Sequence, residues 1–198
     1  ESIKILSNLL LNKNIDTHSR AMINFHLGGA YEDVRDNNKA IKLYKDSYNF
    51  FKKGNKAMAI NINKCIGTVL SNTGDYETAL SLYDDYLLFH KKEKNYIEIA
   101  TVYQHIAAIH FYRGEYDKAY KFYKNQYDIA KKIDAKILLQ PSAGGLGLIN
   151  LIKGNYSKAL NIFNEILIVL EDINDKLNIG LTYGNLGIAY KNLKEYDD

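Results

Sequence analysis

Apolar and small residues recur along most of the chain with the spacing of amphipathic helices. Near the start, positions 3, 6, 9 and 10 are apolar and form one helical stripe. Later stretches end in short polar turns with a glycine, as at Gly74, Gly114 and Gly154, and such glycines suit the left-handed residue that ends a helix. The pattern predicts helices at about 2–12, 17–34, 37–53, 56–72, 76–92, 96–112, 116–132, 135–152, 156–171 and 175–193.

One turn, with the helix after it, is repeated. Residues 113–119 read Arg-Gly-Glu-Tyr-Asp-Lys-Ala, and 73–79 and 153–159 follow the same pattern. A weaker copy begins at Arg35, and a truncated copy occupies 194–198. The alanines that end the copies, at 40, 79, 119 and 159, are 39, 40 and 40 residues apart. A fixed period of this size is typical of stacked-repeat proteins. We therefore expect one solenoid over 1–198, with units at about 17–53, 56–92, 96–132 and 135–171 and half-units at 1–12 and 175–198.

Small residues stand at fixed places in each predicted unit. Four of the five first helices have a glycine at the same position, namely Gly28, Gly67, Gly147 and Gly187. Glycine inside a helix costs up to ~1 kcal/mol against alanine, so a packing reason is needed. We expect another helix backbone to pass there and leave no room for a side chain. The repeated alanines would do the same on the second helices, where leucine would overpack by roughly 1–3 kcal/mol.

Composition and charge exclude several classes of protein. The 198 residues are 46% apolar with one proline, which argues against disorder and against an all-β design. The longest apolar run, 166–170, is far shorter than the ~20 residues that a membrane helix needs. A net charge of +3 is too small to imply nucleic acid. We expect neither a membrane nor a nucleic acid as partner.

The cysteine count and the chain ends suggest a setting. Cys65 is the only cysteine, which excludes an internal disulfide and suits a reducing compartment, so we expect a cytoplasmic protein. The chain begins at Glu1 within an apolar pattern and stops as a new helix begins. We interpret it as a fragment of a longer protein whose other parts could carry an activity of their own.

The repeated motifs resemble those of a known family. Leu-Gly-Ile-Ala-Tyr at 186–190, its copy at 27–31 and the turn motif at 114–119 resemble the tetratricopeptide repeat. The period of 39–40 is similar to that of a longer-helix subgroup found in bacterial regulators and kinesin light chains. The resemblance implies an all-α, right-handed superhelical solenoid of antiparallel helix pairs, with the first helices on its concave face. The sequence departs from the family pattern at Arg35, His110, Asn150 and Lys194.

This arrangement implies a binding groove along the first helices, on the stripe opposite their packing face. The groove is expected to be acidic near Glu32 and Asp33, then polar, then apolar. An extended or helical peptide could bury its side chains in the apolar part and bond to the groove amides. The alternative is that Phe111 and Leu148 only pack on neighbouring units. The predicted partner-binding residues are Asn61, Lys64, Gln104, His105, Phe111, Tyr112, Leu148, Leu151, Ile152, Asn185 and Lys191.

Signals for catalysis or cofactors are weak. His26, Cys65 and His105 occupy one place in three successive units, and both residue types bind metals. Adjacent helix axes lie ~8–10 Å apart, however, so three such side chains could not comfortably reach one ion, and no fourth ligand is evident. No Ser/His/Asp or Cys/His set comes with a motif. We therefore expect no metal, no cofactor and no enzymatic activity.

The segment 141–147 is unusual for a first helix. Its Gly-Gly-Leu-Gly run lacks the Lys-Ser/Thr of a phosphate-binding loop and does not follow a strand. If the helix starts near Ala135, Pro141 lies inside it and costs ~3 kcal/mol or kinks it. If the helix starts at Pro141, the proline is well placed. In either case this first helix is weak, and we hypothesise a hinge or a close-approach site.

These observations favour a scaffold that binds a protein or peptide in its concave groove. One alternative is a sensor or regulatory segment of a larger protein, such as a bacterial protease, an NTPase or a peptide-sensing transcription regulator. Another is self-association through the uncapped ends. Paired lysines at 52–53, 91–92 and 131–132 indicate either an acidic partner or simple helix-end charge.

Overall fold

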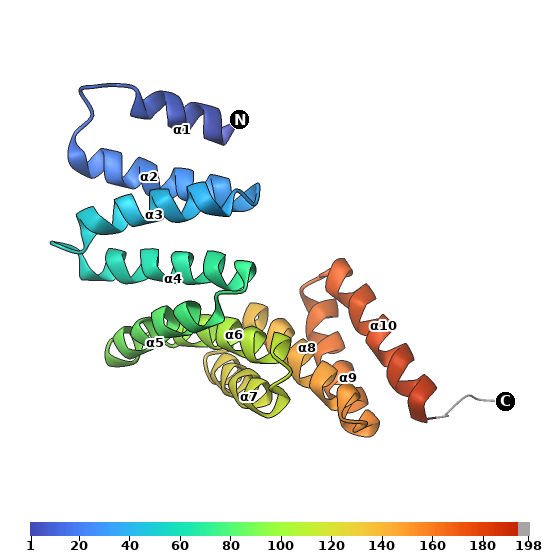
Figure 1. The fold of residues 1–198 in the computed structure, drawn as a ribbon. Helices are drawn as coiled ribbons and strands as arrows, with labels where there is room; N and C mark the ends of the chain where they lie inside the picture. The colour runs from blue at the N-terminus through green and yellow to red at the C-terminus, as the bar shows by residue number, and fades with distance from the viewer. Residues whose placement is uncertain (194–198) are drawn as a thin grey trace. The chain divides into compact units, whose positions relative to one another are not determined.

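The structure, a computed structural model, describes residues 1–193, and these are helical almost throughout, without a strand (Figure 1). The prediction of an all-α fold of antiparallel helix pairs is confirmed. The bounds predicted for α5, α6 and α7 agree to the residue, whereas α1 and α3 end two residues early. The truncated repeat copy at 194–198 lies outside the described residues. The helices are α1 (Ser2–Leu10), α2 (Thr17–Asp33), α3 (Asn37–Phe51), α4 (Lys56–Thr73), α5 (Tyr76–Lys92), α6 (Tyr96–Tyr112), α7 (Tyr116–Lys132), α8 (Lys136–Ile152), α9 (Tyr156–Asp172) and α10 (Lys176–Leu193).

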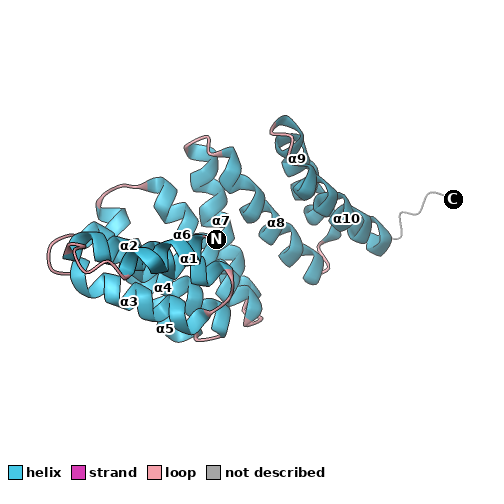
Figure 2. Cartoon of the chain, turned by 90° about the horizontal axis from the view of Figure 1, so that it is seen from above, coloured by secondary structure: helices cyan, strands magenta, loops and turns pink. Residues whose placement is uncertain are grey.

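The helices form two compact units, Glu1–Glu93 and Lys94–Asp198. The first unit contains α1 to α5 and the second contains α6 to α10; short loops join the helices (Figure 2). Within each unit, helices that follow one another in the chain pack together. The first helices α2 and α4 are also neighbours in the first unit, as are α6, α8 and α10 in the second. The expectation of one continuous solenoid over both units stays a prediction.

The glycines of the first helices make room for aromatic rings. The pairs are Gly28 with Tyr44, Gly67 with Tyr83, and Gly147 with Phe163. A Cβ on Gly28 or Gly67 would lie 2.8 or 3.0 Å from the facing ring, and a Cβ on Gly147 would overlap its ring. Our expectation of a passing helix backbone was therefore wrong, because a ring from the next helix fills the space. Gly187 differs, since no described atom lies within 4 Å of the place for its Cβ.

The repeated alanines of the second helices are completely buried, as predicted. Ala40, Ala79, Ala119 and Ala159 each have 0% exposure. They lie four residues before the aromatic residues of the second helices, so each alanine and its ring are on one helical face. Each of these second helices thus contributes one small and one large side chain to the core from this face.

The turn inside each helix pair contains a residue in the left-handed conformation, and these residues recur with the period of the repeat. Gly74, Gly114 and Gly154 have φ values of 89°, 73° and 74°, which confirms the predicted role of these glycines. Arg35 takes the same conformation in the first pair, with φ 61°. The loops between pairs contain a second series that the sequence analysis missed. Its members have φ values of 55°, 52° and 54° at Lys94, Asp134 and Asn174.

His110 occupies a place where the family pattern has a large apolar side chain, and it joins the end of α6 to the turn. Its Nδ1 lies 2.8 Å from Glu115 Oε2, and its ring stacks on Phe122 with centroids 5.5 Å apart. Glu115 also pairs with Arg113 and Lys118, at 2.9 and 2.8 Å. The buried imidazole therefore has both an aromatic and a polar partner.

Asn150 repeats this arrangement with an amide at the end of α8. Its Nδ2 donates to the carbonyl oxygen of Leu146 at 2.8 Å, and its Oδ1 accepts from Asn155 Nδ2 at 3.4 Å. The Asn155 side chain makes no capping bond to α9. In the first unit, by contrast, Asp75 caps α5, because its Oδ1 accepts a hydrogen bond from the Thr78 backbone N–H.

Pro141 lies inside α8, which begins at Lys136, so the first of the two alternatives for this segment holds. A proline has no N–H to donate to the carbonyl four residues earlier, here that of Ile137. The next carbonyl, of Leu138, lies 3.4 Å from Gln126 Nε2 of α7 and 3.1 Å from the Ser142 hydroxyl. Side chains thus supply hydrogen bonds around the proline. The hinge itself stays a prediction.

Candidate functional site

Two cavities open along the first helices of the second unit, on either side of Leu148. The smaller, of about 140 Å³, lies between α6 and α8 and is lined by Ala108, Phe111, Tyr112, Tyr123, Gly145 and Leu148. The larger, of about 300 Å³, lies between α8 and α10 and is lined by Gln140, Gly144, Leu148, Phe163, Ile166, Leu181, Thr182 and Asn185.

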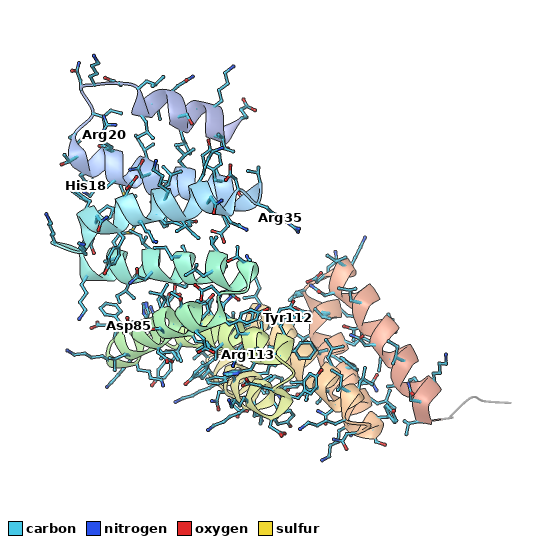
Figure 3. The ribbon with its side chains drawn as sticks, in the orientation of Figure 1. His18, Arg20, Arg35, Asp85, Tyr112 and Arg113 are labelled. Atoms are coloured by element: carbon cyan, nitrogen blue, oxygen red, sulfur yellow. The ribbon has the colours of Figure 1, made fainter. Side chains whose placement is uncertain are left out.

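The structure brings four of the predicted groove residues together at these cavities. Phe111, Tyr112 and Leu148 line the smaller one, and Leu148 and Asn185 line the larger one. Tyr112 is 74% exposed at the end of α6 (Figure 3), and Leu148 is 37% exposed. Phe111 is half-buried and packs against the core, with its ring 5.5 Å from that of Tyr116. Phe111 is therefore in part a packing residue, as the alternative held.

The wall of the larger cavity is unusually bare. A Cβ on Gly144 would meet only the flexible end of Gln140, with its Nε2 3.7 Å away. Gly180 and Gly184 of α10, which do not line the cavity, have no described atom within 4 Å of the place for a Cβ. Unlike Gly147, these glycines make room for no side chain of the described residues. They leave helix backbone open to the close approach of another molecule.

The cavities are also uncharged. Every side chain that lines them is apolar, aromatic, amide or hydroxyl in type. Burial raises the pKa of Tyr123 to about 12, with a smaller contribution from Tyr112, so the Tyr123 hydroxyl is neutral at physiological pH. Gln140 and Asn185 place amide groups, which both donate and accept hydrogen bonds, at the larger cavity. The surface suits apolar side chains attached to a polar, uncharged backbone.

The other predicted residues of the second unit line neither cavity. Gln104 accepts a hydrogen bond of 3.3 Å from Gln126 Nε2. Leu151 packs against the core cluster of α9 and α10. Ile152 is 50% exposed, His105 is half-buried and Lys191 is exposed. Their part in binding stays a prediction.

The predicted residues of the first unit, Asn61 and Lys64, are half-buried on α4. The Lys64 amine lies 5.5 Å from the centre of the Tyr86 ring, a cation–π distance. A cavity of about 370 Å³ lies nearer the start of the unit. The acidic character of this region was predicted from the sequence, but the cavity was not. The residues that line it are Ser2, Leu6, Phe25, His26, Gly29, Ala30, Asp33 and Tyr44.

A further cavity, of about 710 Å³, lies at an edge of the first unit and was missed altogether. It is formed where α2 begins and α3 ends, by Thr17, His18, Asn49, Phe50, Phe51, Lys53, Gly54 and Asn55. The His18 ring, labelled in Figure 3, packs edge-on against Phe51 and Phe50, with centroids 5.4 and 5.8 Å apart. Adjacent aromatic residues were the available signal, since two neighbouring helix positions cannot both face the core.

Three further observations concern metal binding, membrane crossing and the paired lysines. Among residues 1–193, no group of three or more His, Cys, Asp or Glu side chains is placed to hold a metal ion. In the same range, no helix has both the length and the apolar character that crossing a bilayer requires. One member of the lysine pairs, Lys131, forms an ion pair with Glu165, which supports a structural part for that charge.

Comparisons with known proteins agree with this architecture. Residues 98–167, from α6 into α9, match the family model described as Tetratricopeptide repeat. No curated protein sequence matches the chain. Among solved structures, BtubC (BKLC) from P. vanneervenii is similar with a TM-score of 0.79 at 16% identity, over 98% of this chain and 81% of that one.

Two further solved structures are similar at comparable identity. A Rap protein complexed with Competence and Sporulation Factor has a TM-score of 0.75 at 15% identity, over 90% of this chain and 53% of that one. A Signal Transduction ATPase with Numerous Domains protein with a tetratricopeptide repeat sensor, from Pyrococcus horikoshii, has a TM-score of 0.77 at 19% identity. That match covers 95% of this chain and 29% of the other. The chain thus has a tetratricopeptide-like fold, and its residues 98–167 match the tetratricopeptide repeat family.

Proposed function

We propose that the chain is a non-catalytic interaction module, located in the cytoplasm, whose second unit binds a peptide segment of another protein across Leu148. The observation that carries this proposal is the pair of uncharged cavities on either side of that side chain. An apolar side chain of the ligand would enter each cavity, and Gln140 and Asn185 would bond to its backbone. The bare wall at Gly144 lets a peptide backbone come close to α8.

The relatives support an interaction role for this fold. The Rap structure is a complex with Competence and Sporulation Factor, so a protein of the same fold holds another molecule. At 15% identity the likeness shows the fold alone, and the argument for a ligand here comes from the cavities of this chain.

A phage-displayed library of random dodecapeptides, selected on the whole chain, tests the proposal. Selected peptides should bind the chain and lose affinity about tenfold with Leu148→Ala or Tyr112→Ala, because each change removes an exposed apolar contact. The matched control is Ile168→Ala, which removes a side chain that is 70% exposed on α9 and lines neither cavity. Circular dichroism should show equal helicity in all variants. Unchanged affinity in both cavity variants would contradict the proposal.

A second candidate is a sensor segment of a longer protein, in which the ligand changes the arrangement of the helices. Pro141 inside α8 favours it, because the helix there lacks a backbone hydrogen bond. A solved STAND protein with a tetratricopeptide repeat sensor is similar to this chain over 29% of its own length. Solution scattering with and without a selected peptide separates the two candidates. A sensor should change its radius of gyration, whereas a rigid scaffold should keep it.

A further inference from the structure

We infer that the first unit holds a separate subsite, formed by α1, α2 and α3, for the guanidinium group of an arginine in a protein ligand. The inference rests on the proposed interaction function and adds the chemical class of one ligand side chain. The subsite consists of the 370 Å³ cavity, with Phe25, His26 and Tyr44 as its aromatic lining and Asp33 as its acidic lining, together with the neighbouring Glu32.

Three aromatic side chains contribute to the lining, although the Tyr44 ring itself is buried against Gly28. The Phe25 ring lies 5.8 Å from the Tyr44 ring and 5.2 Å from the His26 ring, measured between centroids. The faces of such rings attract cations within about 6 Å. A guanidinium group stacks on aromatic faces and is weakly hydrated, so arginine suits this lining better than lysine. A cavity of about 370 Å³ is also in the usual range for ligand sites.

Two carboxylates accompany these rings. Asp33 lines the cavity and is exposed. Glu32 lies behind it and accepts a hydrogen bond of 2.7 Å from the hydroxyl of Tyr44, which itself lines the cavity. This bond holds the Glu32 carboxylate against the Tyr44 side of the cavity and leaves further lone pairs for another donor. A guanidinium, with five N–H donors in a planar fork, can use several acceptors at once.

The state of Glu32 in the structure also points to a cation. Burial raises the pKa of Glu32, and the hydrogen bond from Tyr44 only partly opposes this effect. The charged carboxylate is therefore held at a cost in stability. A bound cation would offset that cost, whereas an apolar or anionic ligand would increase it.

The surrounding charges leave the region net negative. Lys64 on α4 acts on Glu32 from the next first helix, and its amine lies over the Tyr86 ring. No lysine or arginine lines the cavity itself. Asp33 and Glu32 thus outnumber the one cation that acts on Glu32. A metal ion is a poorer fit, because no group of three metal-binding side chains is found among residues 1–193.

Two synthetic probes that differ in charge test the subsite. They are acetyl-Gly-Arg-Gly-amide and acetyl-Gly-citrulline-Gly-amide, in which citrulline keeps the shape of arginine and lacks its charge. The arginine probe, titrated into the whole chain, should shift the backbone amide resonances of Gly29, Ala30 and Asp33 in a saturable way. The citrulline probe should bind at least about tenfold more weakly than the arginine probe. Added salt should weaken binding of the arginine probe and leave binding of the citrulline probe unchanged.

Variants of the two carboxylates give the specific control. Glu32→Gln keeps an acceptor for Tyr44, and Asp33→Asn keeps the shape of the side chain, so both should fold. Each should weaken binding of the arginine probe severalfold, and Glu32→Gln should also raise the melting temperature, since it removes a half-buried charge. The matched control is Asp85→Asn, an exposed carboxylate on α5 of the same unit (Figure 3), which should change neither quantity.

The outcomes separate this subsite from the proposed function. Equal affinity for the two probes, or unchanged affinity in the Glu32→Gln/Asp33→Asn double variant, would overturn the subsite. Selected peptides that still lose affinity with Leu148→Ala would then leave the proposed function standing. Conversely, the chain could respond specifically to the arginine probe while its selected peptides bind equally well before and after Leu148→Ala. That result would support the subsite and contradict the cavity site of the second unit.

Discussion

Gly147 of α8 and Phe163 of α9 are complementary in shape, because the phenyl ring occupies the space that a Cβ on Gly147 would need. The same relationship joins Gly28 to Tyr44. In each case the ring comes from the second helix of the same pair and lies 16 residues after the glycine. In these helix pairs an aromatic ring of the second helix fills the space beside a glycine of the first, in addition to ordinary apolar burial.

This contact makes the effect of one methyl group depend on its position. Gly147→Ala should lower the free energy of unfolding by roughly 1–3 kcal/mol, because the new Cβ overlaps the ring of Phe163. Gly184→Ala should instead raise it by up to ~1 kcal/mol, because no described atom lies within 4 Å of its Cβ and alanine favours helix. Urea denaturation measures both. Effects of the same sign would contradict this account of the glycines.

The turn glycines act through the backbone and not through packing. Gly114 has φ 73°, and no described atom lies within 4 Å of the place for a Cβ. Gly114→Ala should nevertheless lower the free energy of unfolding by about 1 kcal/mol, because an L-residue is strained in the left-handed conformation. Denaturation of this variant beside Gly184→Ala checks the reason. A stabilised Gly114→Ala would show that the turn had moved to another conformation.

Gly144 offers a test in which stability and binding should change in opposite directions. A methyl group there meets only the end of Gln140, so Gly144→Ala should raise the free energy of unfolding by up to ~1 kcal/mol. The same methyl group projects into the larger cavity and should lower the affinity for selected peptides severalfold. Denaturation and peptide titration of one sample measure both effects. Unchanged peptide affinity would remove Gly144 from the binding surface.

The cluster around Glu115 predicts a pH dependence. Hydrogen bonds from Lys118 and then His110 lower the pKa of Glu115 to about 2. A carboxyl with a lowered pKa in the folded state contributes stability above its unfolded pKa of about 4.5, and this is lost as the pH falls toward about 2. Glu115→Gln should therefore flatten the fall in melting temperature over that window. Exposed Asp128→Asn is the comparison, and an equal slope in wild type and Glu115→Gln would contradict the prediction.

Pro141 predicts a locally weak start to α8. The amides of residues 138–140 and 142 should exchange with solvent faster than those of residues 98–100 and 102 in α6, which has no proline. Pro141→Ala should slow this exchange, because the new N–H can bond to the carbonyl of Ile137. Hydrogen exchange followed by NMR gives both rates. Equal rates in α6 and α8 of the wild type would exclude the hinge.

Much of the fold could be read from the sequence because its signals are local. Periodic apolar residues and turn glycines gave the helix bounds to within two residues. The reason for the glycines was missed, because their partner rings lie on another helix and only packing reveals them. The left-handed residues at Lys94, Asp134 and Asn174 were missed because their side chains give no such signal. Asn and Asp do favour that conformation among the non-glycine types, but lysine does not, so residue type alone gives no consistent signal.

The candidate sites were predicted less completely, for a related reason. Helical register was enough to bring Phe111, Tyr112 and Leu148 to one surface. Register could not show that Leu151 packs against the core, because that depends on the neighbouring helices. It also could not show the cavity at His18, which loops and helix ends form together. Self-association through the chain ends stays a prediction, which sedimentation over a range of concentrations tests.

The contact between a glycine of one helix and an aromatic ring of the next has a consequence for how repeat proteins gain or lose units. At Gly147 and Phe163 the glycine and the ring belong to one helix pair, so the segment 134–173, which begins at one left-handed loop residue and ends just before the next, contains both residues of the contact. Copying that whole segment duplicates the complete contact. A cut inside a pair would separate the two. Gene duplication and protein engineering can therefore lengthen the array safely only in whole blocks of forty.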